Sequence, residues 1–311
     1  MENRNQVRKN SQTYNKPRSA VQRYKQIIDN WKQFQKECKR QERKTVRKNP
    51  IKSSEGFEQK LEEDFPDVEQ ADWNQNVYRL NSEKSAGKSM LHWLGEYYVQ
   101  EESAALPVQV LDPEPGEKVL DMCAAPGGKT TQIASKMDNK GTVIANDKNP
   151  KRLKSLHANI YRTGSTAANV VNYDGRRIPK KVKYDKILVD APCSGEGNNS
   201  RRNFKSASEH ELKTLSNIQQ KLLENAEKLL KKDGRIVYST CTFAPEENES
   251  VVEKTLENTD LRLENIESDI EHVRGVNKFQ DTEFSFETSK TVRVYPHHMR
   301  SGGIYVARFT K

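Results

Sequence analysis

The sequence has 311 residues, a length that allows one substantial catalytic domain and a smaller appended one. Its 53 Lys and Arg residues against 44 Asp and Glu residues give a net charge of +9, and much of this excess lies between Arg4 and Lys48. A polyanion is the natural partner of such a charge distribution, and a solvated basic face is the alternative interpretation.

Several classes of protein are disfavoured by residues that are missing. The four cysteines are widely separated and form no Cys-x-x-Cys pair: Cys38, Cys123, Cys193 and Cys241. No secretory-type apolar segment stands at the N-terminus, so we expect a reduced, cytoplasmic protein, and we expect a monomer. No apolar stretch approaches the roughly 20 residues that cross a bilayer, which predicts no membrane partner. Adjacent His297 and His298 do not share a helical face as an i,i+4 pair does, so we expect no metal.

Residues 1–60 are predicted to form a basic, helical, RNA-binding extension. Its apolar positions recur every three or four residues, as in an amphipathic helix: Tyr24, Ile27, Ile28, Trp31, Phe34 and Cys38. We interpret this stripe as a packing surface, and the intervening Lys25, Lys32 and Lys36 as a face that follows phosphates. Residues 41–58 are polar and charged, which predicts a linker, and 61–105 are predicted to connect to a catalytic domain at 106–311.

The catalytic part shows strands and helices in alternation. Strands are predicted at 118–122, 142–146, 168–172, 186–190 and 235–240, and helices at 130–137, 151–163, 209–232 and 246–257. This order is typical of an α/β fold with a parallel sheet covered on both faces. Residues 291–295 and 304–309 are predicted to close the sheet as an antiparallel pair. Pro245, Glu246 and Glu247 suit the first turn of a helix, so we interpret them as structural.

A glycine-bearing loop follows the apolar pair Val119-Leu120. The segment reads Asp121-Met122-Cys123-Ala124-Ala125-Pro126-Gly127-Gly128-Lys129-Thr130-Thr131. Small residues after the first strand of such a sheet let a nucleotide-like cofactor approach the backbone. The segment also falls one residue short of a phosphate-binding P-loop, because Cys123 stands where that motif needs glycine, so an NTPase remains an alternative.

Acidic residues favour a different cofactor. Asp121 precedes the loop and Asp147 ends the second strand, where an acid accepts hydrogen bonds from ribose hydroxyls and repels a triphosphate. Gly-x-Gly-x-x-Gly is absent, which disfavours a nicotinamide cofactor. Asp174 and Asp190 extend the line of acids along the same crevice. A ligand with adenosine at one end and a positive centre at the other fits this arrangement, which describes S-adenosylmethionine.

Two cysteines end neighbouring predicted strands. Cys193 lies in Asp190-Ala191-Pro192-Cys193-Ser194-Gly195, and Cys241 lies in Tyr238-Ser239-Thr240-Cys241-Thr242. Carbon C5 of a pyrimidine attacks a sulfonium methyl group only after a thiolate has added to C6, so either cysteine is a candidate nucleophile. Asp190 is placed to hold the cytosine edge or to face the sulfonium. The alternative is that both cysteines are small, buried and inert.

With these motifs, the chain resembles the RNA cytosine-5 methyltransferases of the RsmB/NOP type. The resemblance runs from about Trp73 onward and includes Gly95–Glu101, Asp121–Lys129, Asp190–Gly195, Tyr238–Thr242 and Gly302–Ala307. It implies a Rossmann-like class I methyltransferase domain, a mostly parallel seven-stranded sheet with a C-terminal antiparallel pair, after a small basic extension. It implies that S-adenosylmethionine is bound by Cys123, Ala124, Ala125, Pro126, Gly127, Gly128, Lys129, Asp147, Asp174 and Asp190. It also implies that Cys241 is the nucleophile and that Cys193 assists product release.

The sequence therefore predicts an enzyme that methylates C5 of a cytosine in RNA, with an unpaired or flipped target base. We expect tRNA as the substrate, because a compact chain suits a small structured RNA, with rRNA as the alternative. From other classes, a P-loop NTPase and a non-catalytic RNA-binding factor remain open.

Overall fold

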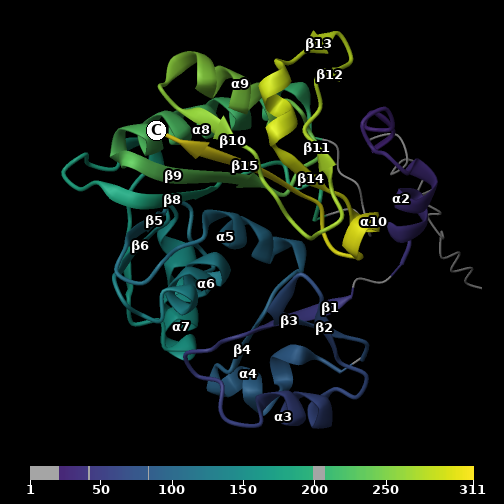
Figure 1. The fold of residues 1–311 in the computed structure, drawn as a ribbon, viewed down its shortest axis with the longest axis vertical. Coiled ribbons are helices and arrows are strands. Elements are labelled where there is room, and N and C mark those ends of the chain that lie inside the picture. Colours follow the sequence, from purple (N-terminus) through teal and green to yellow (C-terminus); the bar gives the residue numbers. More distant parts are fainter. Residues whose placement is uncertain (1–20, 41–42, 83, 199–206) are drawn as a thin grey trace, which may run out of the picture.

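The computed structural model describes residues 21–40, 43–82, 84–198 and 207–311 (Figure 1). The basic residues predicted before Val21 lie outside the described part. Two folded units are joined by one chain: a small sheet domain at 43–102 and a larger α/β domain that begins near Leu106. Within the described residues, no helix is both long and apolar enough to span a membrane.

The large sheet is parallel over most of its width. Its order is β11-β14-β15-β9-β8-β5-β6-β7, with β10 paired to β15. The parallel strands are β5 (Lys118–Asp121), β6 (Thr142–Asn146), β7 (Ala168–Val171), β8 (Tyr184–Asp190) and β9 (Leu230–Thr240). The antiparallel strands are β10 (Arg262–Glu264), β11 (Val273–Arg274), β14 (Val292–Val294) and β15 (Ile304–Thr310). The predicted Rossmann-like α/β class and its closing antiparallel pair are confirmed, with further antiparallel strands at that edge.

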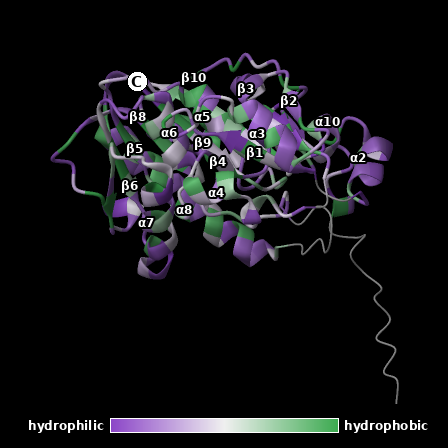
Figure 2. Cartoon of the chain, turned by 90° about the horizontal axis from the view of Figure 1, so that it is seen from below, coloured by the Kyte–Doolittle hydropathy of each residue, from purple (hydrophilic) through white to green (hydrophobic). Residues whose placement is uncertain are grey.

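Helices cover both faces of this sheet. On one face lie α5 (Leu106–Leu111), α6 (Gly128–Lys136) and α7 (Pro150–Thr163), and on the other lie α8 (Glu209–Leu229) and α9 (Glu249–Asn258). Ile187, Leu188 and Val189 of β8 are consecutive and fully buried, as a strand covered on both faces requires. Figure 2 shows the hydrophobic colour along the central strands and the hydrophilic colour on α2 (Trp31–Glu37) at the rim.

The small domain is an antiparallel sheet in the order β2-β3-β1-β4, with two helices against it. Its elements are β1 (Lys44–Lys48), α3 (Phe57–Asp64), β2 (Glu69–Ala71), β3 (Asn74–Leu80), α4 (Met90–Leu94) and β4 (Tyr97–Val99). The predicted linker over 41–58 is wrong, because β1 pairs with both β3 and β4 and Phe57 is fully buried. The predicted boundary at residue 60 likewise divides one folded unit. Charged Lys44, Arg47 and Lys48 concealed the strand, since long side chains bury their stems.

The segment 21–40 packs on the large domain. It forms a turn over 21–27 and then α2, in place of the single predicted helix. Tyr24 and Phe34 lie in one apolar cluster with Phe243 and Tyr295, which confirms the packing role of the apolar stripe. Lys25, Lys32 and Lys36 are exposed. Two details near the C-terminus complete the domain: α10 (Pro296–Met299) joins β14 to β15, and β12 (Lys278–Phe279) pairs with β13 (Thr282–Glu283).

Candidate active site

A cavity of about 670 Å³ opens at the carboxyl ends of β5, β6, β8 and β9. Open parallel sheets bind ligands at this edge, and the volume lies in the usual range for small-molecule sites. Its polar lining includes Cys123, Asp147, Asp174, Asp190, Cys193, Asn198 and Cys241, and its apolar wall includes Met122, Ile218 and Leu222. Seven positions predicted from the sequence therefore line one cavity: the six acids and cysteines in that set, and Ala125.

The structure brings the two cysteines together. Asp190 and Ser239 are paired across the parallel strands β8 and β9, and each cysteine follows two or three residues later. The distance from Cys193 Sγ to Cys241 Sγ is 3.2 Å, and the backbone N–H of Cys241 donates to Cys193 Sγ at 3.3 Å. On the other side, the side-chain amide of Asn198 donates to Cys241 Sγ at 3.2 Å. Both sulfurs border the cavity, within reach of one bound ring.

The two thiols have different environments. The hydrogen bond to Cys241, together with burial, raises the pKa of Cys193 well above its ordinary value. Cys193 therefore keeps its proton at neutral pH, and its Sγ is in hydrogen-bond contact with the Cys241 sulfur. Cys123 also has a raised pKa, first because it is buried and then because Asp121, Asp190 and Asp147 surround it. It lines the cavity as a neutral thiol.

Asp190 joins the glycine loop to the thiol side of the cavity. One carboxylate oxygen pairs with Lys129 Nζ at 2.8 Å, and the other accepts a hydrogen bond from Ser239 Oγ at 2.7 Å. Burial lowers the pKa of Lys129, but the Asp190 carboxylate outweighs burial and leaves that pKa raised. The lysine is thus a cation at neutral pH, and it is paired with the Asp190 carboxylate. A P-loop lysine has to face phosphates instead, so the geometry disfavours the NTPase interpretation.

The glycine loop enters α6 directly. Gly127 adopts a φ of +111° before the first turn, and a side chain at Gly128 would stand 3.2 Å from the Tyr98 ring. Behind the loop, Thr130 Oγ1 donates to the buried Asp121 carboxylate at 2.7 Å, and burial raises the pKa of Asp121 to about 7. Cys123 and Ala125 line the cavity, whereas Ala124, Pro126, Gly127, Gly128 and Lys129 lie outside its lining.

Asp147 and Asp174 shape the opposite end of the cavity. Asp147 accepts from the backbone N–H groups of Ala125, at 3.2 Å, and Asn149, at 2.8 Å. Arg152 Nη1 lies 3.3 Å from the Asp147 carboxylate. Asp174 pairs with Arg176 and Lys148, and the hydrogen bond from Arg176 holds the pKa of Asp174 well below its usual value. Both acids are charged and face the cavity.

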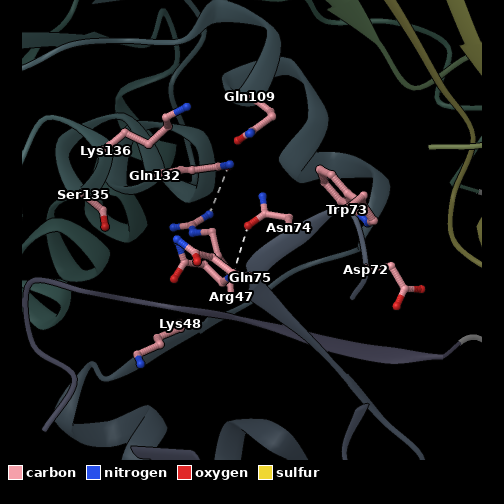
Figure 3. Close-up of a pocket in the computed structure, with 11 residues that line it drawn as sticks. Arg47, Lys48, Asp72, Trp73, Asn74, Gln75, Gln109, Gln132, Ser135 and Lys136 are labelled. Atoms are coloured by element: carbon pink, nitrogen blue, oxygen red, sulfur yellow. Dashed lines mark hydrogen bonds between the residues drawn. The ribbon is translucent and has the colours of Figure 1, made fainter. Parts of the chain in front are cut away.

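Arg47 of the small domain supports the glycine loop from behind. Its guanidinium donates to Gly128 O and Thr131 Oγ1, each at 2.9 Å, and lies over the Tyr98 ring at 5.4 Å. Burial lowers the pKa of Arg47 to about 9. Figure 3 shows Arg47 and Gln132 in the pocket of about 390 Å³ between the two domains. No sequence pattern pointed to this contact, because the arginine lies in the segment interpreted as a linker.

Asn198 and Glu247 are also site residues that the sequence did not single out. Glu247 is fully buried and accepts from Ser194 N at 3.0 Å and Gln219 Nε2 at 2.8 Å. The helix predicted from residue 246 begins instead at Glu249, so Glu247 stands in a turn before α9. The prediction that Glu247 lies in the first turn of this helix is therefore wrong. The error arose because Pro-Glu-Glu is a common way to begin a helix.

One cluster has the residue types of a metal site. Ligand-type atoms of Asp29, His297 and His298 lie within 4.8 Å of one another. The backbone N–H of Tyr295 donates to His298 Nδ1 at 3.1 Å, so Nε2 carries the proton and donates to Asp29 at 3.2 Å. A protonated ring nitrogen does not bind a metal. Hydrogen bonds within the cluster join the segment 21–40 to α10.

Comparisons with known proteins show the family of the chain. The family described as 16S rRNA methyltransferase RsmB/F matches residues 108–310, and the N-terminal domain of 16S rRNA methyltransferase RsmF matches residues 17–102. The second match begins well before Trp73, where the sequence resemblance was expected to start.

Two curated relatives and one solved structure are similar over most of the chain. The tRNA (cytosine(49)-C(5))-methyltransferase of Pyrococcus abyssi is 35% identical over 301 residues, 94% of this chain and 96% of the relative. The 25S rRNA (cytosine-C(5))-methyltransferase nop2 of Schizosaccharomyces pombe is 38% identical over 244 residues, 75% of this chain but only 40% of the relative. A methyltransferase homolog protein from Pyrococcus horikoshii superposes with a TM-score of 0.79 at 29% identity, covering 94% of this chain and 99% of that one.

Proposed function

The chain belongs to the RsmB/F methyltransferase family, and we propose that its substrate is tRNA and that its nucleophile is Cys241. Its reaction is S-adenosylmethionine-dependent methylation of cytosine C5 in RNA. The observation that carries the proposed mechanism is the pair of thiols 3.2 Å apart at the edge of the cavity.

The cavity fits S-adenosylmethionine by the chemistry of its lining. Charged Asp147 and Asp174 offer acceptors for hydroxyl groups at one end, and Met122 and Leu222 offer an apolar wall. Asp190 places a carboxylate between that end and the thiols. When bound, S-adenosylmethionine supplies the methyl group. A sulfonium is favoured beside the carboxylate, and the pair with Lys129 fixes the position of Asp190.

Cys241 would begin the reaction on the flipped cytosine. Its sulfur, as the thiolate, bonds to C6, and the electron pair moves to C5, which then takes the methyl group. The side-chain amide of Asn198 donates to this sulfur at 3.2 Å, and Cys193 Sγ lies 3.2 Å from it, so both contacts hold it in place before attack. In the last step the C5 proton leaves to a base, the C5–C6 double bond re-forms, and the Cys241 sulfur departs as thiolate.

Cys193 is suited to assist that release. Its Sγ lies 3.2 Å from the Cys241 sulfur, so it stands beside the carbon pair that Cys241 would attack. In the last step Cys193, as the thiolate after losing its proton to solvent, would accept the C5 proton while the Cys241 sulfur departs.

The preference for tRNA rests on how much of each relative the chain spans. It covers 96% of the archaeal tRNA relative and 40% of the fission yeast rRNA relative. The relative that the chain matches along nearly its whole length is named as a tRNA methyltransferase, which supports tRNA as the substrate. rRNA remains the second candidate, because both matching family descriptions refer to 16S rRNA. The cytoplasmic location, the monomeric state and the absence of a metal stay predictions.

The test is methylation of bulk tRNA and of rRNA, in separate reactions, with labelled S-adenosylmethionine, followed by digestion and identification of the labelled nucleoside. We expect 5-methylcytidine from tRNA. Label found only in rRNA would overturn the tRNA proposal. Hydrolysis of ATP, lost on Lys129→Ala, would favour the NTPase interpretation.

A further inference from the structure

The segment 21–40 reaches the loop that carries Cys193. The Tyr24 hydroxyl donates to a carboxylate oxygen of Glu196, although 172 positions separate the two residues. Tyr24 is 1% exposed and Glu196 is 4% exposed. A second contact joins the segment to the loop that follows Cys241, since Arg23 pairs with Glu246. The catalytic loop therefore packs against residues that the sequence assigned to an RNA-binding extension.

Hydroxyl groups connect Glu196 to the residues that follow both thiols. Thr242, which directly follows Cys241, has one hydroxyl proton, and it is shared between Ser194 Oγ and the same Glu196 oxygen, which lies at 3.4 Å. Ser194 directly follows Cys193, and its Oγ lies 2.8 Å from Thr242 Oγ1. The loop after β8 and the loop after β9 are thus hydrogen-bonded to each other one residue beyond each sulfur.

A second buried carboxylate completes the network. Glu247 accepts from the backbone N–H and the hydroxyl of Ser194, at 3.0 and 2.5 Å, and from Gln219. Burial raises the pKa of both Glu196 and Glu247, and their hydrogen-bond donors oppose that shift. Removing a hydrogen-bond donor from a buried carboxylate costs free energy, so each donor holds its carboxylate in position. Tyr24 is the donor that comes from outside the large domain.

We infer that Tyr24 is a positioning residue, which acts through Glu196 and the Ser194–Thr242 bridge to set the spacing of Cys193 and Cys241. The inference rests on the proposed function, because it assigns the thiols their catalytic roles. Exposed Lys25, Lys32 and Lys36 lie on the same segment. The segment 21–40 thus presents cations to solvent and also sets the spacing of the two thiols. RNA bound to its exposed lysines would therefore contact the segment that sets this spacing.

The test variant is Tyr24→Phe, which removes the hydroxyl and keeps the ring. The ring centroid lies 6.0 Å from the rings of Phe243 and of Phe279, so the apolar packing is retained. Tyr161→Phe is the matched control, because the Tyr161 side chain is 88% exposed. Glu196→Gln is a second variant that keeps the side-chain shape and weakens acceptance from Tyr24.

The first readout needs neither RNA nor cofactor. Diamide oxidises two adjacent thiols to a disulfide and is itself reduced, so the rate of the Cys193–Cys241 crosslink reports their alignment. Peptide mapping would measure it. We expect Tyr24→Phe and Glu196→Gln to slow this crosslink several-fold while the control matches the wild type, with melting temperatures recorded for all.

The second readout is methylation. Misplacement of reacting groups by a fraction of an ångström costs on the order of tenfold in rate, so we expect kcat to fall by about that factor in Tyr24→Phe with KM for RNA nearly unchanged. Wild-type crosslinking by both variants would overturn the inference. A rise in KM alone with unchanged crosslinking would also overturn it and would assign Tyr24 to RNA contact. Slower crosslinking in a protein that methylates no RNA would support the inference and refute the proposed function.

Discussion

The two sides of the cavity are held together in different ways. On the cofactor side, several supporting contacts join residues close in sequence, such as Asp174 with Arg176 and Thr130 with Asp121, and others, such as Ala125 with Asp147, span about 22 positions. On the thiol side they join distant residues, such as Ser194 with Glu247 and Tyr24 with Glu196. Local contacts position a loop relative to the strand and helix that it joins. Distant contacts position two separate loops relative to each other, so that the two sulfurs lie side by side. The chemistry is therefore more sensitive to the wider fold on the thiol side.

Asp190 spans both sides, so its removal should have the largest effect among the four changes that follow. Asp190→Asn removes the negative charge that faces Lys129 and weakens the acceptor of Ser239. A cation left without its partner at this site, together with a lost charge beside the sulfonium, should lower kcat/KM by about 100-fold or more. Steady-state methylation kinetics would measure it. Asp138→Asn, an exposed residue paired with Lys140, should leave the rate unchanged.

Asp121 tests the cofactor side through the pH dependence of stability. Its pKa is raised to about 7 in the folded chain and is roughly 3.9 in the unfolded chain. Between these values the folded state binds more protons, so the free energy of unfolding should fall as pH rises from about 4 to 7 and then level off. The slope from this group is at most about 1.4 kcal/mol per pH unit. Asp121→Asn should remove it in urea unfolding curves, and an unchanged slope would contradict the assigned environment.

Arg47 contacts the glycine loop on the cofactor side from the small domain, which is distant in sequence. Arg47→Met keeps much of the side-chain length but leaves Gly128 O and Thr131 Oγ1 without this donor. We expect a loss of about 1–3 kcal/mol in the free energy of unfolding and weaker cofactor binding by calorimetry. Lys48→Met, which breaks the neighbouring pair with Glu58 and the contact of Lys48 Nζ with the Phe57 ring, should cost far less. Equal effects would mean that the contact with the loop is unimportant.

The smallest effect is expected at the surface of the segment 21–40. Replacing Lys25, Lys32 and Lys36 by Glu should weaken RNA binding and reduce the slope of log K against log salt by about 2 to 3, while cofactor affinity stays intact. Fluorescence anisotropy across a salt series would measure the RNA affinity and its dependence on salt. The matched control reverses Lys228, Lys231 and Lys232, which are exposed at the end of α8 and the start of β9. Unchanged RNA binding in the first variant would refute the phosphate role.

The same contrast explains how much the sequence predicted. Strand–helix alternation gave the parallel sheet, and the glycine loop and both cysteines were found because each ends a strand with a short apolar run. The small domain was missed because β1 carries a single core apolar residue, Val46, among charged neighbours. Glu247 and Tyr24 were read as a helix start and a packing residue. Their roles depend on partners 53 and 172 positions away, which no local pattern encodes.

The most direct test of the mechanism compares wild-type protein, Cys241→Ala and Cys193→Ala on tRNA with labelled S-adenosylmethionine. Each reaction would be resolved into free 5-methylcytidine and covalent protein–RNA adduct. The account predicts 5-methylcytidine from the wild type, neither product from Cys241→Ala, and accumulated adduct from Cys193→Ala, because addition proceeds and release fails. Adduct formed by Cys241→Ala, with none formed by Cys193→Ala, would contradict it and make Cys193 the nucleophile.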